Sequence, residues 1–208
     1  MFAIDVGCGP GNYIKSQTEA QSCPVEWTGP DPSEDMLAFA RDKVLDARWV
    51  HCSAEDLQFT TDEFDFVYSS FAYHHFEDKD RAFDEIDRVL KPDGIVKFVN
   101  ICPEYVQDAT VYRFFDTTFD TDSNRHPSLK WLMNAFKVRG YEVDVQVRVT
   151  YKTAPKYQVI ESVEIRDNST LAILDDDLFE DGLQRIYDLG EDEVTDETAF
   201  LTIKARKM

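Results

Sequence analysis

The stretch that decides the fold is Ala3-Ile4-Asp5-Val6-Gly7-Cys8-Gly9-Pro10-Gly11. A short apolar run is followed by glycines at alternate positions, and the residues from Gly11 to about Gln21 can form a helix. Glycine lets the backbone turn sharply and lets a ligand approach the main chain closely. The stretch therefore predicts a strand, a ligand-binding glycine loop and a helix, in that order.

The glycine spacing separates this loop from two better-known nucleotide loops. The dinucleotide signature is G-x-G-x-x-G, whereas these glycines fall at positions 7, 9 and 11 and position 12 is Asn. The lysine-serine pair of a phosphate-binding P-loop is also absent after the glycines. The glycine spacing therefore disfavours a nicotinamide-dependent oxidoreductase. Binding of reduced nicotinamide cofactor would be needed to restore that hypothesis.

The pattern outward from this loop alternates between strands and helices. We expect strands over residues 2–6, 25–29, 48–51, 64–69 and 95–101. Helices are expected after Ser33, a capping residue followed by two acids, and over residues 80–90, with Lys91-Pro92-Asp93-Gly94 as a turn. Strands and helices that alternate with short loops predict a parallel sheet with helices on both faces.

The second half of the chain has a different pattern. We expect helices over 105–119, 128–139 and 177–189, an alternating strand over 141–151 and a last strand over 199–205, with loops at 168–170 and 191–197. No linker divides the chain. We therefore expect one domain over residues 1–208, with a cofactor-binding half (1–101) and a substrate or lid half (102–208).

Composition narrows the classes of partner. The 208 residues carry 41 acidic and 22 basic side chains, a net charge of −19. This charge disfavours nucleic acid and anionic lipid, which need a cationic surface. We find no apolar run long enough for a membrane span and no signal peptide, and we expect a cytoplasmic, acidic protein. The spacing of the cysteines matches no metal-binding pattern, so we expect no metal site. We expect the four cysteines to be reduced thiols; they are Cys8, Cys23, Cys52 and Cys102.

The glycine stretch resembles the first motif of class I S-adenosylmethionine-dependent methyltransferases. In that superfamily the glycine loop passes around the methionine part of S-adenosylmethionine, which places Asp5, Gly7, Gly9 and Gly11 at the cofactor. Residues 29–37 resemble the second-strand motif, whose acid accepts hydrogen bonds from both ribose hydroxyls; a carboxylate has acceptor sites for two donors. The resemblance implies this role for Asp31, with Pro32 on the adenine face.

Three further stretches extend the resemblance over residues 2 to about 101. Ser53-Ala54-Glu55-Asp56-Leu57 resembles the adenine loop, in which Ser53 replaces the usual acid and Glu55 could substitute for it. Residues 64–70 resemble the fourth strand, with Ser69 beside the cofactor. Arg88-Val89-Leu90-Lys91-Pro92-Asp93-Gly94 resembles the turn into the fifth strand. The implied cofactor residues therefore include Ser53, Ala54, Glu55 and Ser69.

The resemblance implies a Rossmann-like α/β fold, with a seven-stranded, mostly parallel sheet in the order 3-2-1-4-5-7-6. The implied function is transfer of a methyl group from S-adenosylmethionine to O, N or C of a small-molecule acceptor, leaving S-adenosylhomocysteine. The alternative is a degenerate fold that acts as a non-catalytic cofactor-binding or scaffold protein. Product formation with any acceptor separates the two.

The residues after the fourth strand supply the candidates for chemistry. His74 or His75 could act as the general base that takes a proton from the acceptor. The alternative is that both orient the loop or pack. Substrate-binding candidates are Tyr13, Ser70, Tyr73 and Arg113, for which core packing or a solvated charge is the other interpretation.

Related enzymes usually carry a helical segment ahead of the first strand that covers the cofactor, whereas Met1 of this sequence lies at that strand. We expect one of three explanations: the start is late, another protomer covers the site in a homodimer, or catalysis has been lost.

Overall fold

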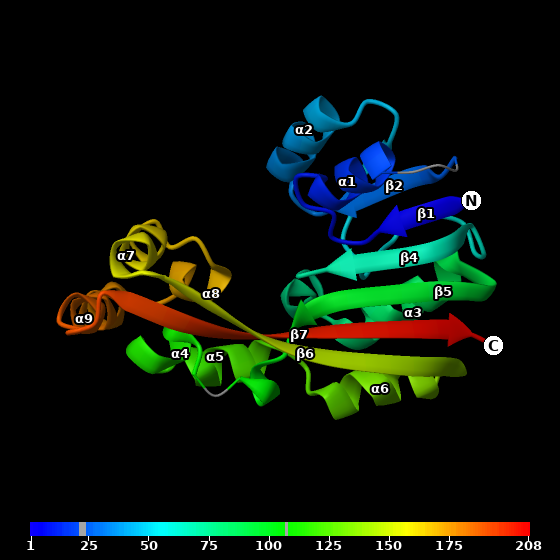
Figure 1. Ribbon diagram of the computed structural model, residues 1–208. Coiled ribbons are helices and arrows are strands. Elements are labelled where there is room, and N and C mark those ends of the chain that lie inside the picture. The colour runs from blue at the N-terminus through cyan, green and yellow to red at the C-terminus, as the bar shows by residue number, and fades with distance from the viewer. Residues whose placement is uncertain (21–23, 107) are drawn as a thin grey trace. The chain divides into compact units, whose positions relative to one another are not determined.

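The computed structural model describes residues 1–20, 24–106 and 108–208. They form two compact units: residues 1–100, 129–146 and 201–208 make the first, and 101–128 and 147–200 make the second. A seven-stranded sheet runs in the order β3-β2-β1-β4-β5-β7-β6 (Figure 1), which confirms the predicted Rossmann-like strand order.

The first five strands lie in the first unit, apart from the last residue of the fifth. They are β1 (Phe2–Asp5), β2 (Glu26–Asp31), β3 (Arg48–His51), β4 (Phe64–Ser70) and β5 (Leu90–Ile101). Each pairs in parallel with its neighbour in the order β3-β2-β1-β4-β5. Because β1 lies between β2 and β4, the strand order reverses at β1, and such a switch point is where open α/β sheets bind ligands.

One face of this sheet is covered by α1 (Asn12–Ala20) and α2 (Glu34–Lys43). Ser33 caps α2 as predicted, since its hydroxyl accepts a hydrogen bond from the Met36 amide at 3.3 Å. The side chains that join these helices to the sheet are apolar and buried; they are Ala3, Cys8, Ile14, Trp27, Leu37 and Val44. We call this set the α1–α2 core.

The other face is covered by α3 (Lys79–Val89) and α6 (Leu129–Lys137). Tyr68 pairs with Lys97 and Ser69 with Phe98, so Tyr68 and Phe98 point to opposite faces. Phe98 contacts Phe83 of α3 and Phe136 of α6, at ring-centroid distances of 5.4 and 5.5 Å. These aromatic contacts hold both helices against β5.

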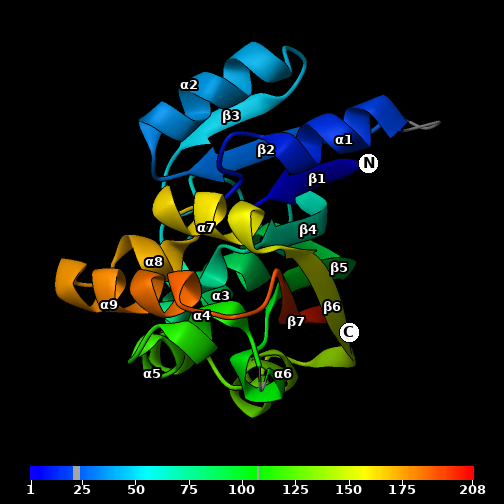
Figure 2. The same cartoon turned by 60° about the vertical axis from the view of Figure 1, so that its left-hand side comes forward.

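The second unit has a core of its own, which its helices mostly supply. This unit also contains parts of β6 (Tyr141–Pro155) and β7 (Glu193–Lys207). Its helices are η2 (Pro103–Tyr105), α4 (Thr110–Phe114), α5 (Thr118–Arg125), α7 (Lys156–Glu164), α8 (Ser169–Ala172) and α9 (Asp176–Tyr187). Figure 2 shows α8 and α9 near α4 and α5. Its buried apolar residues are Phe114, Phe115, Val163, Leu171, Leu174, Phe179, Leu183, Ile186 and Val194.

A buried acid connects three helices of the second unit. Asp122 of α5 is 1% exposed, and its carboxylate accepts hydrogen bonds from the Tyr112 hydroxyl of α4 at 2.9 Å and the Thr170 hydroxyl of α8 at 2.7 Å. Burying a carboxylate costs free energy unless it is hydrogen-bonded, and these two contacts offset that cost for Asp122.

Three expectations for the second half were wrong. The single helix expected over 105–119 is divided into η2, α4 and α5, and the chain breaks at Thr117, whose φ is 67°. The loop expected at 168–170 contains Asn168, which caps α8 by accepting hydrogen bonds from the amides of Thr170 and Leu171. The loop expected at 191–197 lies partly in β7, which begins at Glu193.

The expectation of a turn at 91–94 before the fifth strand was wrong, because these residues lie inside β5, where the register is irregular. Phe64 pairs with Leu90 while Phe66 pairs with Ile95, so β5 accommodates extra residues between these two pairs. Asp93 has a φ of 64° within this irregularity.

Cys8, Cys52 and Cys102 are buried and unpaired, and Cys23 lies outside the described residues. In the described ranges, no helix is long and apolar enough to cross a bilayer.

Gly182 of α9 should resist substitution because a methyl group has no room there. A Cβ at this position would lie 2.2 Å from the Phe115 ring, which is 1% exposed and cannot move freely. We expect Gly182→Ala to lose about 1–2 kcal/mol of unfolding free energy in urea, after about 1 kcal/mol of gained helix propensity. Gly190→Ala is the control, since its Cβ meets no heavy atom within 4 Å. Equal stability of the two variants would contradict this packing.

Candidate functional site

The candidate site lies at the carboxyl edge of the first unit's sheet, where the strand order reverses. The glycine loop follows β1 there, and the chain that follows β4 carries the paired histidines. The loop is held to both neighbours of β1: Val6 donates its amide to the Tyr68 carbonyl at 2.8 Å, and Gly7 donates to the Pro30 carbonyl at 3.0 Å.

The three glycines are required for different reasons. Gly7, Gly9 and Gly11 have φ values of 72°, 51° and 73°, in the left-handed region that side chains disfavour. A Cβ on Gly7 would lie 2.5 Å from that of Ala72, and one on Gly11 would lie 2.7 Å from the Trp49 ring. A Cβ on Gly9 would have no heavy atom within 4 Å, so Gly9 exposes open main chain to a ligand.

Asp31 joins the end of β2 to this loop. Its Oδ2 accepts a hydrogen bond from the Gly9 amide at 2.8 Å, and its Oδ1 accepts one from the Ser33 amide at 2.9 Å. The residue is 8% exposed. A carboxylate has about four acceptor positions, so Asp31 retains capacity for further donors.

Asp5, the last residue of β1, places a second carboxyl group directly before the loop. It is 2% exposed, and burial raises its pKa to about 8, with the nearby Asp31 charge as the second cause. Asp5 is therefore mostly protonated at neutral pH in the ligand-free protein. A cation bound nearby would favour its ionised form.

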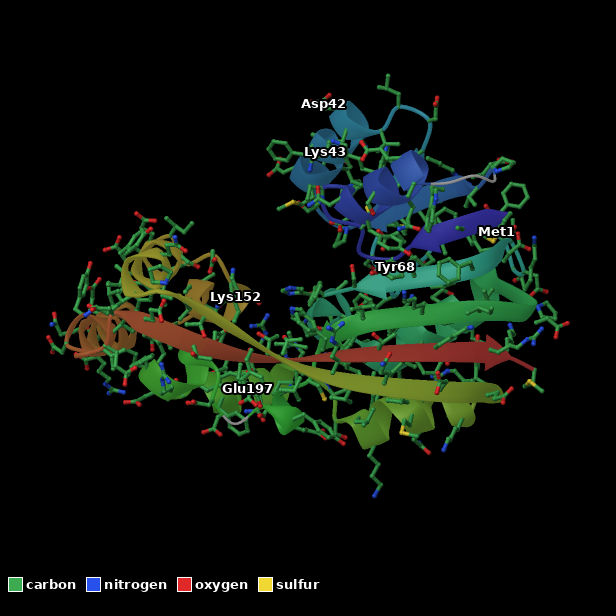
Figure 3. The ribbon with its side chains drawn as sticks, in the orientation of Figure 1. Met1, Asp42, Lys43, Tyr68, Lys152 and Glu197 are labelled. Atoms are coloured by element: carbon green, nitrogen blue, oxygen red, sulfur yellow. The ribbon has the colours of Figure 1, made fainter. Side chains whose placement is uncertain are left out.

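The end of β4 is bonded to the glycine loop through Ser69. Its hydroxyl donates to the Val6 carbonyl at 2.8 Å, and the side chain is 1% exposed. Tyr68, labelled near the end of β4 in Figure 3, stacks on Tyr13 of α1 with ring centroids 3.5 Å apart. Ser70, the last residue of β4, is half-buried.

A left-handed residue starts the segment 71–78 between β4 and α3, which we call the histidine loop. Phe71 has a φ of 50°, a conformation that is strained for a bulky side chain and that turns the chain from β4 into η1 (Tyr73–His75). Tyr73 is 2% exposed and stacks on Phe98 at 6.1 Å. The ring centroids of His74 and His75 lie 4.0 Å apart, and Nδ1 of His74 lies 3.3 Å from Nδ2 of Asn100.

The loop after β3 contains the expected adenine residues. Ala54 is buried, Ser53 is half-buried, and the exposed Pro32 is bonded through its carbonyl to His51 Nε2 at 2.8 Å. Glu55 is directed toward the histidine loop, since its Oε1 accepts the Glu77 amide at 2.8 Å. The expected adenine loop and the histidine loop are therefore bonded to each other.

Arg113, the remaining candidate, belongs to the second unit. Its guanidinium lies 3.6 Å from the Asp108 carboxylate and 4.5 Å from the centre of the Phe114 ring.

Three further residues shape the site and were not singled out from the sequence. They are Tyr68, which stacks on Tyr13; Trp49, which lies against Gly11; and Asn100, which contacts His74. Asn100 carried a usable signal, because it is a polar residue in the otherwise apolar end of β5. The other two look like ordinary strand residues.

Comparison with known protein families finds a methyltransferase domain in the first half of the chain. Residues 4–98 match the methyltransferase domain family. Over 99 residues the chain is 36% identical to the demethylmenaquinone methyltransferase of Staphylococcus aureus strain MRSA252, a match covering 46% of this chain and 41% of that protein. The chain thus spans less than half the length of the curated relatives it matches.

Solved structures extend the likeness of fold over the whole chain. A putative methyltransferase from an antibiotic biosynthesis pathway of Anabaena variabilis ATCC 29413 gives a TM-score of 0.72 at 21% identity, covering 97% of this chain and 89% of that one. The phosphoethanolamine N-methyltransferase 2 of Haemonchus contortus, solved with S-adenosylhomocysteine, gives 0.62 at 22% identity, covering 100% of this chain and 48% of that one. At these identities the likeness shows the fold alone.

The fold and the glycine loop define a Rossmann-like α/β protein with its ligand edge at β1 and β4. Residues 4–98 match the methyltransferase domain family, and this part of the chain is similar to a demethylmenaquinone methyltransferase.

Gly7 and Gly9 should respond differently to the same substitution. Both Gly7→Ala and Gly9→Ala incur the left-handed penalty of about 1 kcal/mol, but only the Gly7 methyl clashes, with Ala72. We expect Gly7→Ala to be the less stable by about 1–3 kcal/mol in urea unfolding. Gly9→Ala should fold yet lose affinity for S-adenosylhomocysteine, because its methyl occupies the open side of the loop. Full affinity in Gly9→Ala would place the ligand elsewhere.

The raised pKa of Asp5 predicts a pH-dependent stability. Between an unfolded pKa near 4 and the folded value of about 8, the unfolded chain loses the Asp5 proton while the native protein keeps it. This group therefore destabilises the native state increasingly as pH rises through that range. We expect Asp5→Asn to gain on the order of 3–4 kcal/mol relative to wild type between pH 5 and pH 8, measured by urea unfolding.

Asp65→Asn is the control for Asp5. The hydrogen bond from Lys91 is the main cause that lowers the pKa of Asp65, so its contribution to stability is lost only in acid and stays constant between pH 5 and pH 8. Parallel pH profiles of Asp5→Asn and wild type would show that Asp5 is ionised in the native protein.

Proposed function

We propose that this protein transfers a methyl group from S-adenosylmethionine to O, N or C of a small-molecule acceptor. One observation carries the proposal: at the sheet's switch point, the buried Asp31 carboxylate is bonded to the amide of Gly9, the glycine with open space beside it. This arrangement places an anionic acceptor of hydrogen bonds beside accessible main chain, which suits a ligand with a hydroxylated sugar and a polar tail.

Each part of the cofactor has a candidate partner. Gly7, Gly9 and Gly11 would follow the methionine part, with Asp5 directly before the loop and Ser69 at the end of β4. The spare acceptor positions of Asp31 would take the ribose hydroxyls. Pro32, Ser53, Ala54 and Glu55 would lie near adenine, with the Glu55 carboxylate already engaged by the Glu77 amide.

Charge supports a cationic ligand. S-adenosylmethionine carries a positive sulfonium and a positive ammonium. Two carboxyl groups lie next to the loop, Asp5 at the end of the strand before it and Asp31 bonded to the Gly9 amide. Binding of a cation there would favour ionisation of Asp5, because an opposite charge stabilises the charged form. The carboxyl groups would thus increase affinity for the charged cofactor over its neutral product.

The reaction is a single displacement. A lone pair on the acceptor forms the new bond to the methyl carbon, the carbon–sulfur bond breaks, and its electrons return to sulfur, giving neutral S-adenosylhomocysteine. An acceptor that carries a proton gives it to a base, for which His74 and His75 are the candidates. Positioning and exclusion of water supply most of the acceleration when the acceptor is already nucleophilic.

The acceptor is proposed only as a small molecule. The family match ends at residue 98, and the alignment with the relative covers 46% of the chain, so most of the second half has no matched family. The net charge of −19 argues against nucleic acid. Tyr13, Ser70, Tyr73 and Arg113 stay candidates for acceptor binding; of these, Tyr73 would need to leave its stack on Phe98 to reach a ligand. A cytoplasmic location and a homodimer are also part of the proposal.

A calorimetric titration with S-adenosylhomocysteine tests the cofactor site. We expect binding by wild type and a loss of about tenfold or more in Asp31→Asn, which keeps the side-chain shape but removes the charge that strengthens hydrogen bonds. Asp35→Ala removes a nearby charge from an exposed residue of α2 and should bind like wild type.

Because Asp31 also accepts two main-chain hydrogen bonds, the melting temperature of each variant must be measured alongside. No binding by folded wild-type protein would refute the proposed cofactor site. Binding without methylated product from any acceptor would favour the scaffold alternative.

A further inference from the structure

We propose that Asn100 is a positioning residue that holds the His74 imidazole in one neutral tautomer, with its proton on Nε2. In this form His74 donates a hydrogen bond to the methyl-accepting molecule instead of taking a proton from it. The consequence for the acceptor rests on the proposed function, whereas the tautomer itself is a property of the protein alone.

Asn100 lies where a polar side chain is unexpected. It is the penultimate residue of β5 and is 0% exposed. Side chains alternate along a strand, so Asn100 shares a face with Phe98 and Val96, both buried apolar residues. A buried amide is costly unless it is hydrogen-bonded. Packing alone would therefore favour an apolar residue at this position.

The contact partner of this amide is the histidine loop. Nδ2 of Asn100 lies 3.3 Å from Nδ1 of His74, although the two residues are 26 apart in the sequence. The contact crosses from the end of β5 to the loop that follows the neighbouring strand β4. It therefore orients the imidazole relative to the sheet edge that carries the glycine loop.

The chemistry of the two nitrogens fixes the tautomer. An amide nitrogen only donates hydrogen bonds, so Nδ1 of His74 must accept through its lone pair. A neutral imidazole whose Nδ1 accepts carries its proton on Nε2. An imidazolium would instead direct an Nδ1 hydrogen at the amide hydrogens, which is unfavourable. The contact thus stabilises the neutral, Nε2-protonated form of His74.

This assignment separates the roles of the adjacent histidines. A ring that is protonated on Nε2 offers a donor, which suits an acceptor molecule with a lone pair on oxygen or nitrogen near the reacting atom. Where the methyl acceptor must lose a proton, the base is then His75, an exposed residue whose ring centroid lies 4.0 Å from that of His74. The opposite arrangement, with the Asn100 carbonyl oxygen facing an Nδ1 hydrogen, would return the base role to His74.

Nitrogen-15 NMR of the histidine side chains tests the tautomer without any substrate. The chain has four histidines, so His74→Gln and His75→Gln spectra assign the two signals by their loss. We expect the neutral His74 of wild type to be protonated on Nε2. In Asn100→Asp a carboxylate replaces the amide and accepts from Nδ1, so His74 should change to the Nδ1-protonated tautomer and gain its positive charge at a pH about one unit higher or more.

Asn134→Asp is the matched control, because it makes the same chemical change at an exposed position of α6 in the same unit. It should leave the His74 tautomer as in wild type. An Nδ1-protonated His74 in wild type would overturn the proposal even if Asn100→Asp fails to fold, and so would an unchanged His74 in folded Asn100→Asp. Failure of S-adenosylhomocysteine to bind would refute the proposed function while leaving this result intact.

Discussion

The carboxylate of Asp31 is the contact on which the site depends. It accepts one hydrogen bond from the glycine loop after β1 and another from the main chain that leads into α2. Two parallel strands and their following segments are therefore fixed to each other by one side chain. A hydroxyl or amide could not serve both amides equally well, because only a carboxylate offers two equivalent oxygens that accept without donating.

Hydrogen bonds connect each loop at this edge of the sheet to the next one. The Val6 carbonyl receives the Ser69 hydroxyl, which connects the glycine loop to β4. Glu55 then connects the loop after β3 to the segment that follows the histidines. A change of position in one loop would therefore affect the next, because a hydrogen bond weakens steeply when its geometry is lost. Residues far apart in the sequence thus form one preorganised edge.

The sequence predicted the first unit well because its signals are local. Glycine spacing, the Ser33 cap and short apolar runs each act within a few residues, and the strand order followed from the family resemblance. The second half was predicted less well. The break at Thr117 and the cap at Asn168 depend on hydrogen bonds and packing within the second unit, and the start of β7 lies in an acid-rich stretch that reads as a loop.

The sequence likewise predicted some residues of the candidate site and missed others. Asp31 and the glycines stand in recognisable motifs, whereas Asn100 gains its meaning only from a contact with His74 that the sequence does not display. The roles assigned to the cofactor and substrate residues stay predictions until binding is measured. Tyr73 illustrates the limit: its place in the loop suggested a ligand contact, and the structure shows a ring stacked in the core.

The two separate cores have a consequence for how such a protein can diverge. The buried cluster of the second unit shares no residue with the α1–α2 core. Substitutions around Phe115 can therefore accumulate and compensate one another without disturbing the packing beneath the glycine loop. Selection can act on one half of the molecule while the other half stays nearly constant, which is how a single ancestral scaffold could give rise to descendants with different chemical targets.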